Sequence, residues 1–464
     1  MPSIISPIDG QPAFSFSYMD GAAALAKLEA AEQAQRAWRQ TSHCERRALL
    51  LAMLDRYAER AQENAEAITR MMGKPMAQAA GEFSGGFCQR VRHLCGIAER
   101  SLADLEIAGE GDGIRRTIRR EPVGVVLNIA AWNYPLLVPI NVVAAAILAG
   151  DAVLLKHAAQ TTLVADQIER AFAEAGAPAG LFSALHVDHR VAAQVIDSGR
   201  LGYVAFTGSV RGGHEVYRQV AENNFIGVGL ELGGKDPALV LEGAPAAKVA
   251  AHLADGAFYN AGQSCCAVER IYVHRSLYGE FVEAFVAEVQ RLKVGDPLDP
   301  ETTMGPVVNP QAAAWVREQA AEALAKGARK LSDDNAFSLP DTSTCYLAPQ
   351  VFDRVDHSMS LMREESFGPI IGIMPFDDDK QALALANDSR FGLSASVWTE
   401  DPSRALAVAE RLQAGTVFQN RCDYLDPALA WTGIKESGHG ASLSELGFHA
   451  VTRPKSYHLR PQIP

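Results

Sequence analysis

Hydrophobic residues recur at helical spacing through the Ala-rich residues 21–72. Leucine, alanine and methionine alternate there with charged side chains, and one stripe holds Leu49, Leu50, Met53, Leu54 and Tyr57. Residues three and four positions apart share one face of a helix, so this pattern predicts two amphipathic helices. A third is expected across about 83–107.

After residue 122, strand-like and helical stretches alternate. Strand-like segments are expected at 123–129, 152–156, 182–187 and 203–206, with helical segments at 135–149, 163–175 and 191–198. A second such region begins near residue 265, with strand-like segments at 270–273, 345–352, 370–376 and 394–399 and helical segments at 277–292 and 315–325. The alternation predicts an α/β fold with parallel sheets covered by helices. Residues 111–122 and 452–459 lack a helical period and predict a small separate sheet.

Composition narrows the class of protein. A chain of 464 residues, 48% of them hydrophobic, is long enough for two or three domains. Its net charge of −12, with both signs interspersed, argues against a nucleic-acid surface. Proline and Asn141 interrupt the most apolar stretch, 134–150, so no membrane span is expected.

Seven cysteines are an odd number without metal-ligand spacing. A chain of this length does not need disulfides to fold, and its N-terminus lacks a basic segment followed by a long apolar one. The sequence therefore predicts a cytoplasmic protein with no metal site.

Two segments bring together groups suited to acyl chemistry. One is Phe258-Tyr-Asn-Ala-Gly-Gln-Ser-Cys-Cys-Ala267, and the other is Glu231-Leu-Gly-Gly-Lys235. Cys265 is a candidate nucleophile, because a thiolate adds readily to a carbonyl carbon, and Glu231 is a candidate base for water. Cys266 is interpreted as a buried packing residue, the commonest role of a free cysteine.

Five segments in one order carry a family resemblance. They are Ala131-Trp-Asn-Tyr-Pro135, Phe206-Thr-Gly-Ser209, Glu231–Lys235, Asn260-Ala-Gly-Gln-Ser-Cys265 and Glu364-Glu-Ser-Phe-Gly-Pro369. With them the chain resembles the aldehyde dehydrogenase superfamily over nearly its full length. The resemblance implies a Rossmann-like NAD(P)-binding domain (1–99 and 122–232), an α/β catalytic domain (233–444) and a β-arm for oligomerisation (100–121 and 445–464).

The resemblance also assigns catalytic roles. Cys265 would attack the aldehyde, Asn133 would donate to the oxyanion, and Glu231 would activate the water that hydrolyses the thioester. From its sequence position alone, Asn133 could equally be a helix N-cap. Glu445 aligns with a carboxylate thought to relay protons in some relatives, and the alternative for it is a surface helix residue.

A hydride must leave the aldehyde carbon, so the resemblance implies NAD or NADP as the acceptor. Lys156 would bind the adenosine ribose, Glu365 the nicotinamide ribose, and Gly208-Ser209 the pyrophosphate, although no G-x-G-x-x-G pattern is present. The full predicted set is Trp132, Lys156, Ala159, Gly208, Ser209, Gly213, Leu232, Glu365 and Phe367.

Some positions depart from the family pattern. Many NAD-preferring relatives carry a glutamate where this chain has Ala159, so a 2′-phosphate would meet no carboxylate, and His157 and Arg211 could approach it. Either NAD or NADP is therefore expected.

Substrate choice is expected in a tunnel whose shape departs from the family pattern. The predicted lining is Val138, Asn141, Ser264, Arg421, Leu425 and Trp431. If Arg421 points inward it could hold the carboxylate of a semialdehyde. If it points outward it leaves an apolar mouth for medium aliphatic or aromatic aldehydes, which is the interpretation we favour.

The sequence thus predicts an enzyme that oxidises a small-molecule aldehyde to a carboxylic acid. The alternatives are a semialdehyde dehydrogenase that uses Arg421, a thiol esterase without redox chemistry, and a member of the fold that has lost catalysis. The resemblance further implies a homodimer or homotetramer. In keeping with this, the alternating Arg115-Arg-Thr-Ile-Arg-Arg120 suits an edge strand.

Overall fold

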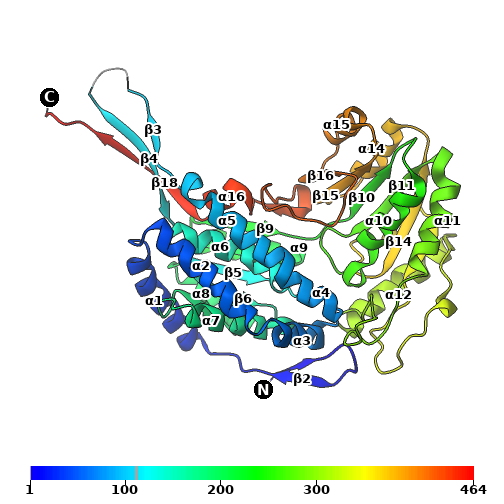
Figure 1. The fold of residues 1–464 in the computed structure, drawn as a ribbon, viewed down its shortest axis with the longest axis horizontal. Coiled ribbons are helices and arrows are strands. Elements are labelled where there is room, and N and C mark those ends of the chain that lie inside the picture. The colour runs from blue at the N-terminus through cyan, green and yellow to red at the C-terminus, as the bar shows by residue number, and fades with distance from the viewer. Residues whose placement is uncertain (1, 110–112, 464) are drawn as a thin grey trace.

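The computed structural model describes residues 2–109 and 113–463, and within them the strands form four sheets (Figure 1). Two are large, with six and seven strands, and each forms the centre of one lobe. A three-stranded sheet projects from the first lobe, and near the N-terminus β1 (Ser3–Ile5) pairs with β2 (Pro12–Ser15).

The six-stranded sheet lies in the N-terminal lobe. Its order is β17 (Gly438–His439), β9 (Gly227–Glu231), β8 (Tyr203–Thr207), β5 (Val125–Ala130), β6 (Ala152–His157) and β7 (Phe182–Ala184). All neighbours except β17 and β9 are parallel. The connecting helices are α6 (Leu137–Ala149), α7 (Leu163–Glu174), α8 (His189–Asp197) and α9 (Val210–Asn223). The predicted alternation of this region is confirmed.

The N-terminal helices pack beside this sheet. They are α1 (Gly21–Trp38), α2 (His43–Ala58), α3 (Ala61–Met72), α4 (Met76–Gly81) and α5 (Cys88–Ser101), with a π-helical turn at Glu82–Phe87. Residues 21–72 thus hold three helices, and the prediction of two was wrong. A capping box between Ser42 and Glu45 starts α2, and Gly73 ends α3 in the left-handed conformation, φ 82°.

The seven-stranded sheet lies in the second lobe. Its order is β12 (Arg329–Lys330), β13 (Gln350–Asp353), β14 (Ile370–Phe376), β11 (Val268–His274), β10 (Asp236–Val240), β15 (Ser394–Trp398) and β16 (Thr416–Gln419). Its helices are α10 (Ala246–Phe258), α11 (Tyr278–Val289), α12 (Pro310–Ala325), α13 (Ser360–Arg363), α14 (Asp379–Asn387) and α15 (Pro402–Ala409). The strand expected at 345–352 begins only at Gln350. The sequence pattern missed β9, β10 and α10.

Each large sheet has its own hydrophobic core. The first core also holds Leu393, Trp431 and Leu443 from the later part of the chain, and β17 adds antiparallel to β9. The chain therefore returns from the second lobe to the edge of the first sheet. This return brings residues 431–443 beside Glu231, at the end of β9.

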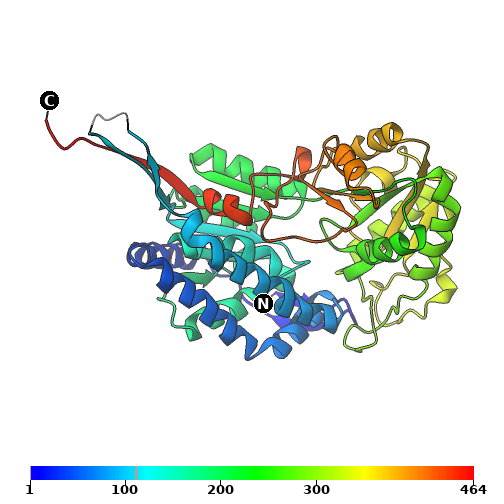
Figure 2. The same cartoon turned by 45° about the horizontal axis from the view of Figure 1, so that its top comes forward.

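The projecting sheet consists of β18 (Thr452–Leu459), β4 (Arg115–Pro122) and β3 (Leu105–Ile107) (Figure 2). Arg115 pairs with Glu106 at 2.7 Å, and Arg119 pairs with Asp104 at 2.9 Å. The predicted pairing of the arm with the tail is confirmed for residues 115–122, whereas residues 111 and 112 lie outside the described residues. The short helix α16 (Ser444–Ala450) precedes β18.

The seven cysteines are free thiols. None of the helices in the described part of the chain combines the length and apolar character needed to cross a bilayer.

Candidate active site

Cys265 follows a tight turn at the end of α10. Asn260 and Ala261 have left-handed φ values of 53° and 56°, and Gly262 follows at 71°. A Cβ atom on Gly262 would lie 2.4 Å from the Gly368 carbonyl oxygen, and one on Gly234 would lie 2.6 Å from the Cys265 carbonyl oxygen. These glycines therefore let three segments approach closely around a thiol that is partly exposed.

Asn133 is held beside this turn. Its Nδ2 donates to the Gln263 carbonyl oxygen at 3.2 Å, and its own carbonyl oxygen accepts a hydrogen bond from Asn260 Nδ2 at 3.2 Å. Asn133 is buried and lines the same cavity as Cys265. An amide donor is thus fixed close to the nucleophile.

The two adjacent thiols have different surroundings. Cys266 is buried, its Sγ lies 3.2 Å from Asp423 Oδ1, and its interaction with Cys265, together with burial, raises its pKa well above the ordinary value. Asp423 also accepts a hydrogen bond from Ser264 Oγ at 2.6 Å. One carboxyl group therefore holds the residues on both sides of Cys265, which leaves Cys265 as the accessible thiol of the pair.

Glu231 ends β9 at the wall of this cavity. Burial raises the pKa of its carboxyl group, against the opposing effects of a hydrogen bond from Ser442 Oγ, the charge of Arg90 and a 3.5 Å contact from Thr207 Oγ1. A carboxyl group with a raised pKa is suited to take a proton near neutral pH. No sequence pattern indicated the Ser442 contact, because it depends on the return of the chain to β9.

The cavity that joins these groups has a volume of about 380 Å³. Five of the six predicted tunnel residues line it together with Cys265, Glu231 and Asn133: Val138, Asn141, Ser264, Leu425 and Trp431. Arg421 is outside this lining. It is exposed, and its guanidinium carbon lies 3.4 Å from the centre of the Tyr424 ring.

Glu445 is also outside the cavity. It is exposed on α16, and its Oε1 lies 3.9 Å from His449 Nε2. The residue of this segment that touches Glu231 is instead Ser442.

A buried ion pair supports the cavity from behind. Lys74 Nζ lies 2.7 Å from Glu82 Oε2, and Glu82 Oε1 accepts hydrogen bonds from the backbone N–H groups of Leu136 and Leu137, at 2.8 and 3.1 Å. These two N–H groups lie at the start of α6, three and four residues after Asn133. The pair thus fixes the loop that carries the amide, and no sequence pattern marked Lys74 or Glu82.

A groove of about 620 Å³ runs along the carboxyl ends of β5, β6 and β8. The predicted residues Lys156 and Ser209 line it, and Ser209 caps α9. Lys156 is buried, which lowers its pKa. Gly208 and Gly213 pack too closely against their neighbours to carry a side chain. A Cβ atom on Gly208 would lie 2.8 Å from Phe206, and one on Gly213 would lie 2.7 Å from Leu232.

The basic residues of this groove differ from those expected. His157 is buried, its two ring nitrogens are bonded to the Pro135 carbonyl oxygen and to Thr161 Oγ1, and burial lowers its pKa to about 4. It is therefore neutral and fully bonded, and the expectation that it approaches a phosphate was wrong. Arg211 lines the groove, as does His189, which the sequence reading missed, while Ala159 is exposed at the start of a short 3₁₀ turn.

Glu365 and Phe367 lie where the two lobes meet. Glu365 Oε1 accepts a hydrogen bond from the Gly234 N–H at 3.1 Å, and burial, followed by the charge of Glu269, raises its pKa to about 8. The Phe367 ring packs edge-on against Trp132, with centroids 5.5 Å apart. The structure thus joins residues from all five matched segments around one site.

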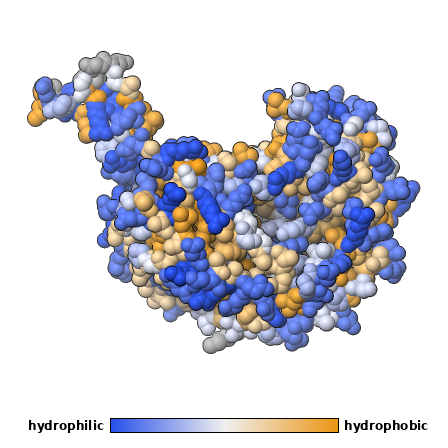
Figure 3. Space-filling view, viewed as in Figure 1, coloured by the Kyte–Doolittle hydropathy of each residue, from blue (hydrophilic) through white to orange (hydrophobic). Residues whose placement is uncertain are grey.

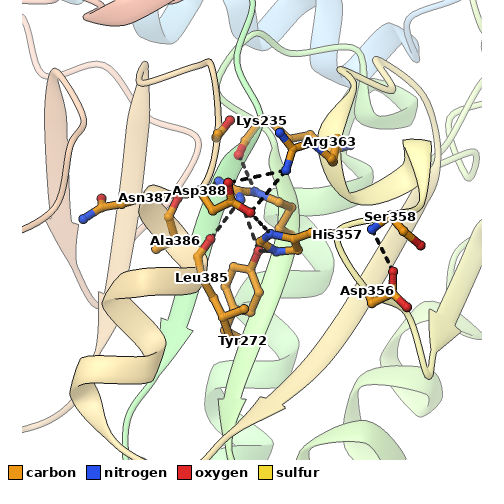
Figure 4. Close-up of polar contacts among 12 residues, drawn as sticks. Lys235, Tyr272, Asp356, His357, Ser358, Arg363, Leu385, Ala386, Asn387 and Asp388 are labelled. Atoms are coloured by element: carbon orange, nitrogen blue, oxygen red, sulfur yellow. Dashed lines mark hydrogen bonds and ion pairs between the residues drawn. The ribbon is translucent and has the colours of Figure 1, made fainter.

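A second buried ion pair holds this loop. Lys235 Nζ lies 2.6 Å from Glu269 Oε2, and Glu269 accepts the backbone N–H groups of Ser366 and Phe367 at 2.8 and 2.9 Å. Arg270 donates to the Lys235 carbonyl oxygen at 2.8 Å and to the Tyr272 hydroxyl at 3.1 Å. The Tyr272 hydroxyl lies 2.8 Å from His357 Nε2, and His357 Nδ1 lies 2.6 Å from Asp388 Oδ2 (Figure 4). The loop therefore rests on a continuous polar network of the second lobe.

These features fit a dinucleotide. The groove offers a helix N-terminus and a buried cation for phosphate and ribose groups. A Cβ atom on Gly233 would lie 2.4 Å from Glu365 Oε1, so the glycine lets this carboxyl group lie close to the backbone. The residues that would hold the group are Lys156 and Ser209 at one end and Glu365 and Phe367 at the other. Phe367 packs on Trp132, and the next residue, Asn133, lines the Cys265 cavity.

Comparison with known proteins agrees with this arrangement. Residues 2–457 match the model of the aldehyde dehydrogenase family. The chain is 35% identical to a succinate semialdehyde dehydrogenase [NAD(P)+] of Escherichia coli strain K12, over 91% of this chain and 90% of that protein.

Two solved structures share the fold. An NAD-dependent aldehyde dehydrogenase from Sinorhizobium meliloti has a TM-score of 0.95 at 31% identity, covering 100% of this chain and 92% of that one. A succinic semialdehyde dehydrogenase from Streptococcus pyogenes, in complex with NADP+, has a TM-score of 0.93 at 29% identity, covering 98% and 99%.

Proposed function

Because this chain belongs to the aldehyde dehydrogenase family and is an NAD(P)-dependent aldehyde dehydrogenase, we propose that it forms a carboxylic acid through a covalent intermediate on Cys265. The observation that carries this proposal is that a partly exposed thiol, a buried amide and a carboxyl group of raised pKa line one cavity. Addition, oxyanion stabilisation and hydrolysis need these three groups.

In the first step the Cys265 thiolate adds to the aldehyde carbon and forms a thiohemiacetal. Asn133 Nδ2 and a backbone N–H near Cys265 donate to the oxyanion. When bound, NAD(P)+ would accept the hydride that leaves this carbon, and Cys265 would then carry the acyl group as a thioester. The rigid turn at 260–262 holds the sulfur while these bonds change.

In the second step Glu231 takes a proton from water. The hydroxide equivalent adds to the thioester carbon, and the carbon–sulfur bond breaks to release the carboxylic acid and the Cys265 thiolate, while the proton taken from water stays on Glu231. Ser442 and Thr207 hold the Glu231 carboxyl group. They keep the base oriented toward the cavity.

The lobe formed by residues 1–99 and 122–232 is proposed to bind the dinucleotide, with 233–444 supplying the nucleophile. Lys156 and Ser209 would contact its adenosine half, and Glu365 with Phe367 its nicotinamide half. An exposed Ala159 and a cationic Arg211 beside the groove support the use of NADP as well as NAD.

The walls of the cavity support a substrate with an aliphatic or aromatic body. Leu137, Val138, Leu425 and Trp431 supply most of the apolar lining. The outward position of Arg421 on Tyr424 does not support a carboxylate site at that residue. Two relatives are named as succinate semialdehyde dehydrogenases.

The proposal is tested by replacing each of the two adjacent thiols. In Cys265→Ser, the rate of reduced-nicotinamide formation from an aldehyde should fall by roughly a thousandfold or more, because the alcohol is a far weaker nucleophile. Cys266→Ser is the matched control and should keep most of the activity. Full activity in Cys265→Ser would overturn the mechanism. Ester cleavage without any aldehyde-dependent reduction of the dinucleotide would indicate a thiol esterase instead.

A further inference from the structure

A buried arginine lies in the wall of the substrate cavity. Arg90, on α5, lines the cavity with Cys265 and Glu231 and is only 5% exposed. Its Nη1 donates to the Leu137 carbonyl oxygen at 2.8 Å and to Asn141 Oδ1 at 2.8 Å. Among the described residues, its Nε is buried without a hydrogen-bond partner, and no carboxylate lies within ion-pair distance of the guanidinium.

A buried charge destabilises the folded protein unless an ion of opposite charge binds it. Removing the ion from water costs on the order of several kcal/mol of solvation free energy. Burial lowers the pKa of Arg90, and the charges of Glu231 and Glu82 raise it, yet a guanidinium stays protonated in proteins. The protein therefore maintains a cation in the cavity wall that its own carboxylates do not contact.

The two nearby carboxyl groups are already engaged. Glu82 pairs with Lys74 and accepts two backbone N–H groups at the start of α6. Glu231 is held by Ser442 and Thr207, and burial raises its pKa. Neither group is bonded to Arg90.

The free side of the guanidinium has a definite shape. With Nη1 committed to Leu137 and Asn141, Nε and Nη2 make up the remaining edge, and no hydrogen bond joins either to the described part of the chain. Two parallel N–H groups on one edge match the two oxygens of a carboxylate. The contacts of Nη1 also fix the plane of the group against α6.

We propose that Arg90 binds a carboxylate at the far end of the substrate, so that the enzyme prefers aldehydes that also carry a carboxylate. This inference rests on the proposed aldehyde oxidation and names the substrate class for the same cavity. The apolar walls then face the carbon chain between the two ends. Arg90 is the one Lys or Arg among the described residues that line the cavity.

The acidic lining residues do not occupy the same position. Asp423 is bonded to Ser264 and Cys266 at the nucleophile turn. Asp255 is exposed on α10. If Asp255 or Asp423 instead bound the far end of the substrate, the enzyme would prefer a cationic aldehyde.

The test compares three aldehydes of similar size with the wild-type enzyme. The probes are succinic semialdehyde, which is anionic, 4-oxopentanal, which is neutral and similar in shape, and 4-aminobutanal, which is cationic. We expect kcat/KM for the anionic aldehyde to exceed that for the neutral one by about tenfold or more, as for a charge-assisted hydrogen bond. Equal values, or a preference for the cationic aldehyde, would overturn the proposal.

Variants assign the preference to a residue. Arg90→Gln should lower the ratio of kcat/KM for the anionic to the neutral aldehyde by about tenfold, chiefly through KM, and Arg90→Lys should lower it less. Arg421→Gln, the exposed control, should leave the ratio unchanged. A purely structural role for Arg90 would lower both kcat/KM values together and leave their ratio intact, which would overturn the assignment.

Inhibition of the wild-type enzyme tests the anion site even if Arg90→Gln fails to fold. Succinate should inhibit the wild-type enzyme competitively with the aldehyde at concentrations where the neutral succinamide does not. Equal inhibition by both would contradict an anion site. If none of the three aldehydes reduces the dinucleotide, the proposed function fails, whereas oxidation without charge preference removes only the Arg90 site.

Discussion

Burial determines the chemical behaviour of individual residues in this cavity. Glu231 is half-buried, and burial raises its pKa, whereas the interaction with Cys265 and then burial raise the pKa of the buried Cys266. For the carboxyl group this moves proton uptake toward the working pH, whereas for the thiol it suppresses the thiolate. The same environment thus makes Glu231 a better base and Cys266 a poorer nucleophile.

The raised pKa of Glu231 predicts a pH dependence for thioester hydrolysis. Only the unprotonated carboxylate can take the proton from water, so below its pKa the rate should fall about tenfold per pH unit, and above it the rate should level off. Decay of a preformed acyl-enzyme, followed by intact-protein mass spectrometry across pH, measures this directly. The midpoint should lie above the ordinary glutamate range.

Glu231→Gln is the control for this profile, because it has no carboxylate to titrate and should hydrolyse the acyl-enzyme slowly at every pH. A wild-type midpoint at the ordinary glutamate pKa would contradict the role of burial. A profile unaffected by Glu231→Gln would show that another group is the base.

At the scale of elements, hydrophobic pattern predicted most of the first sheet because its strands are buried on both faces and separated by long helices. β10 escaped notice because Asp236-Pro237 begins a strand only five residues long, and Pro and Asp are both uncommon in strands. The number of helices within residues 21–72 was likewise underestimated, with two predicted and three observed. Local pattern does not record where tertiary packing makes the chain turn.

The sequence predicted the site residues that belong to a recognisable motif. It did not predict those that only folding brings into the site. Cys265, Glu231 and Asn133 belong to matched segments, and the structure joins them in one cavity. Lys74 lies between α3 and α4, Glu82 in the π-helical turn and Arg90 on α5, all far away in the sequence. Their role follows from the π-helical turn and α5 packing against α6, which no local spacing reveals.

The loop that holds Glu365 and Phe367 depends on the buried pair of Lys235 and Glu269. Replacing Glu269 with Gln leaves the Lys235 ammonium buried without its counterion, which should lower the free energy of unfolding by about 3–5 kcal/mol. It should also weaken NAD(P) binding, because Glu269 accepts the Ser366 and Phe367 N–H groups. Urea unfolding and fluorescence titration with the dinucleotide measure the two effects.

The matched control is Asp377→Asn, which breaks the exposed pair with Arg275 on the same lobe. Exposed pairs contribute little to stability, so this variant should unfold and bind the dinucleotide as the wild type does. If Glu269→Gln behaved like the control, the buried pair would not support the loop.

At the scale of the whole molecule, the arm extends beyond the two lobes with apolar side chains exposed on it (Figure 3). They are Leu105, Ile107, Leu459 and Ile463. A projecting three-stranded sheet with open edges is a surface for pairing with another chain. We propose that residues 100–121 and 445–464 join copies of this chain into a homodimer or homotetramer.

The association is tested by light scattering, in which the mass should be two or four times the 49.8 kDa of one chain. Leu105→Glu with Leu459→Glu should shift the enzyme toward monomer, because charges on the arm oppose its burial. Leu406→Glu, at an exposed position on α15 in the other lobe, should not. A wild-type monomer at micromolar concentration would contradict the proposal.

The central claim is that the substrate is first oxidised and then hydrolysed while it is bound covalently to Cys265, and that Glu231 is needed only for the hydrolysis. Rapid mixing of Glu231→Gln with aldehyde and NAD(P)+, followed by peptide mass spectrometry, tests it most directly. The account predicts a burst of one reduced nicotinamide per active site, little further turnover, and an acyl group on Cys265. Continued turnover at the wild-type rate, or a burst without acylation of Cys265, would contradict it.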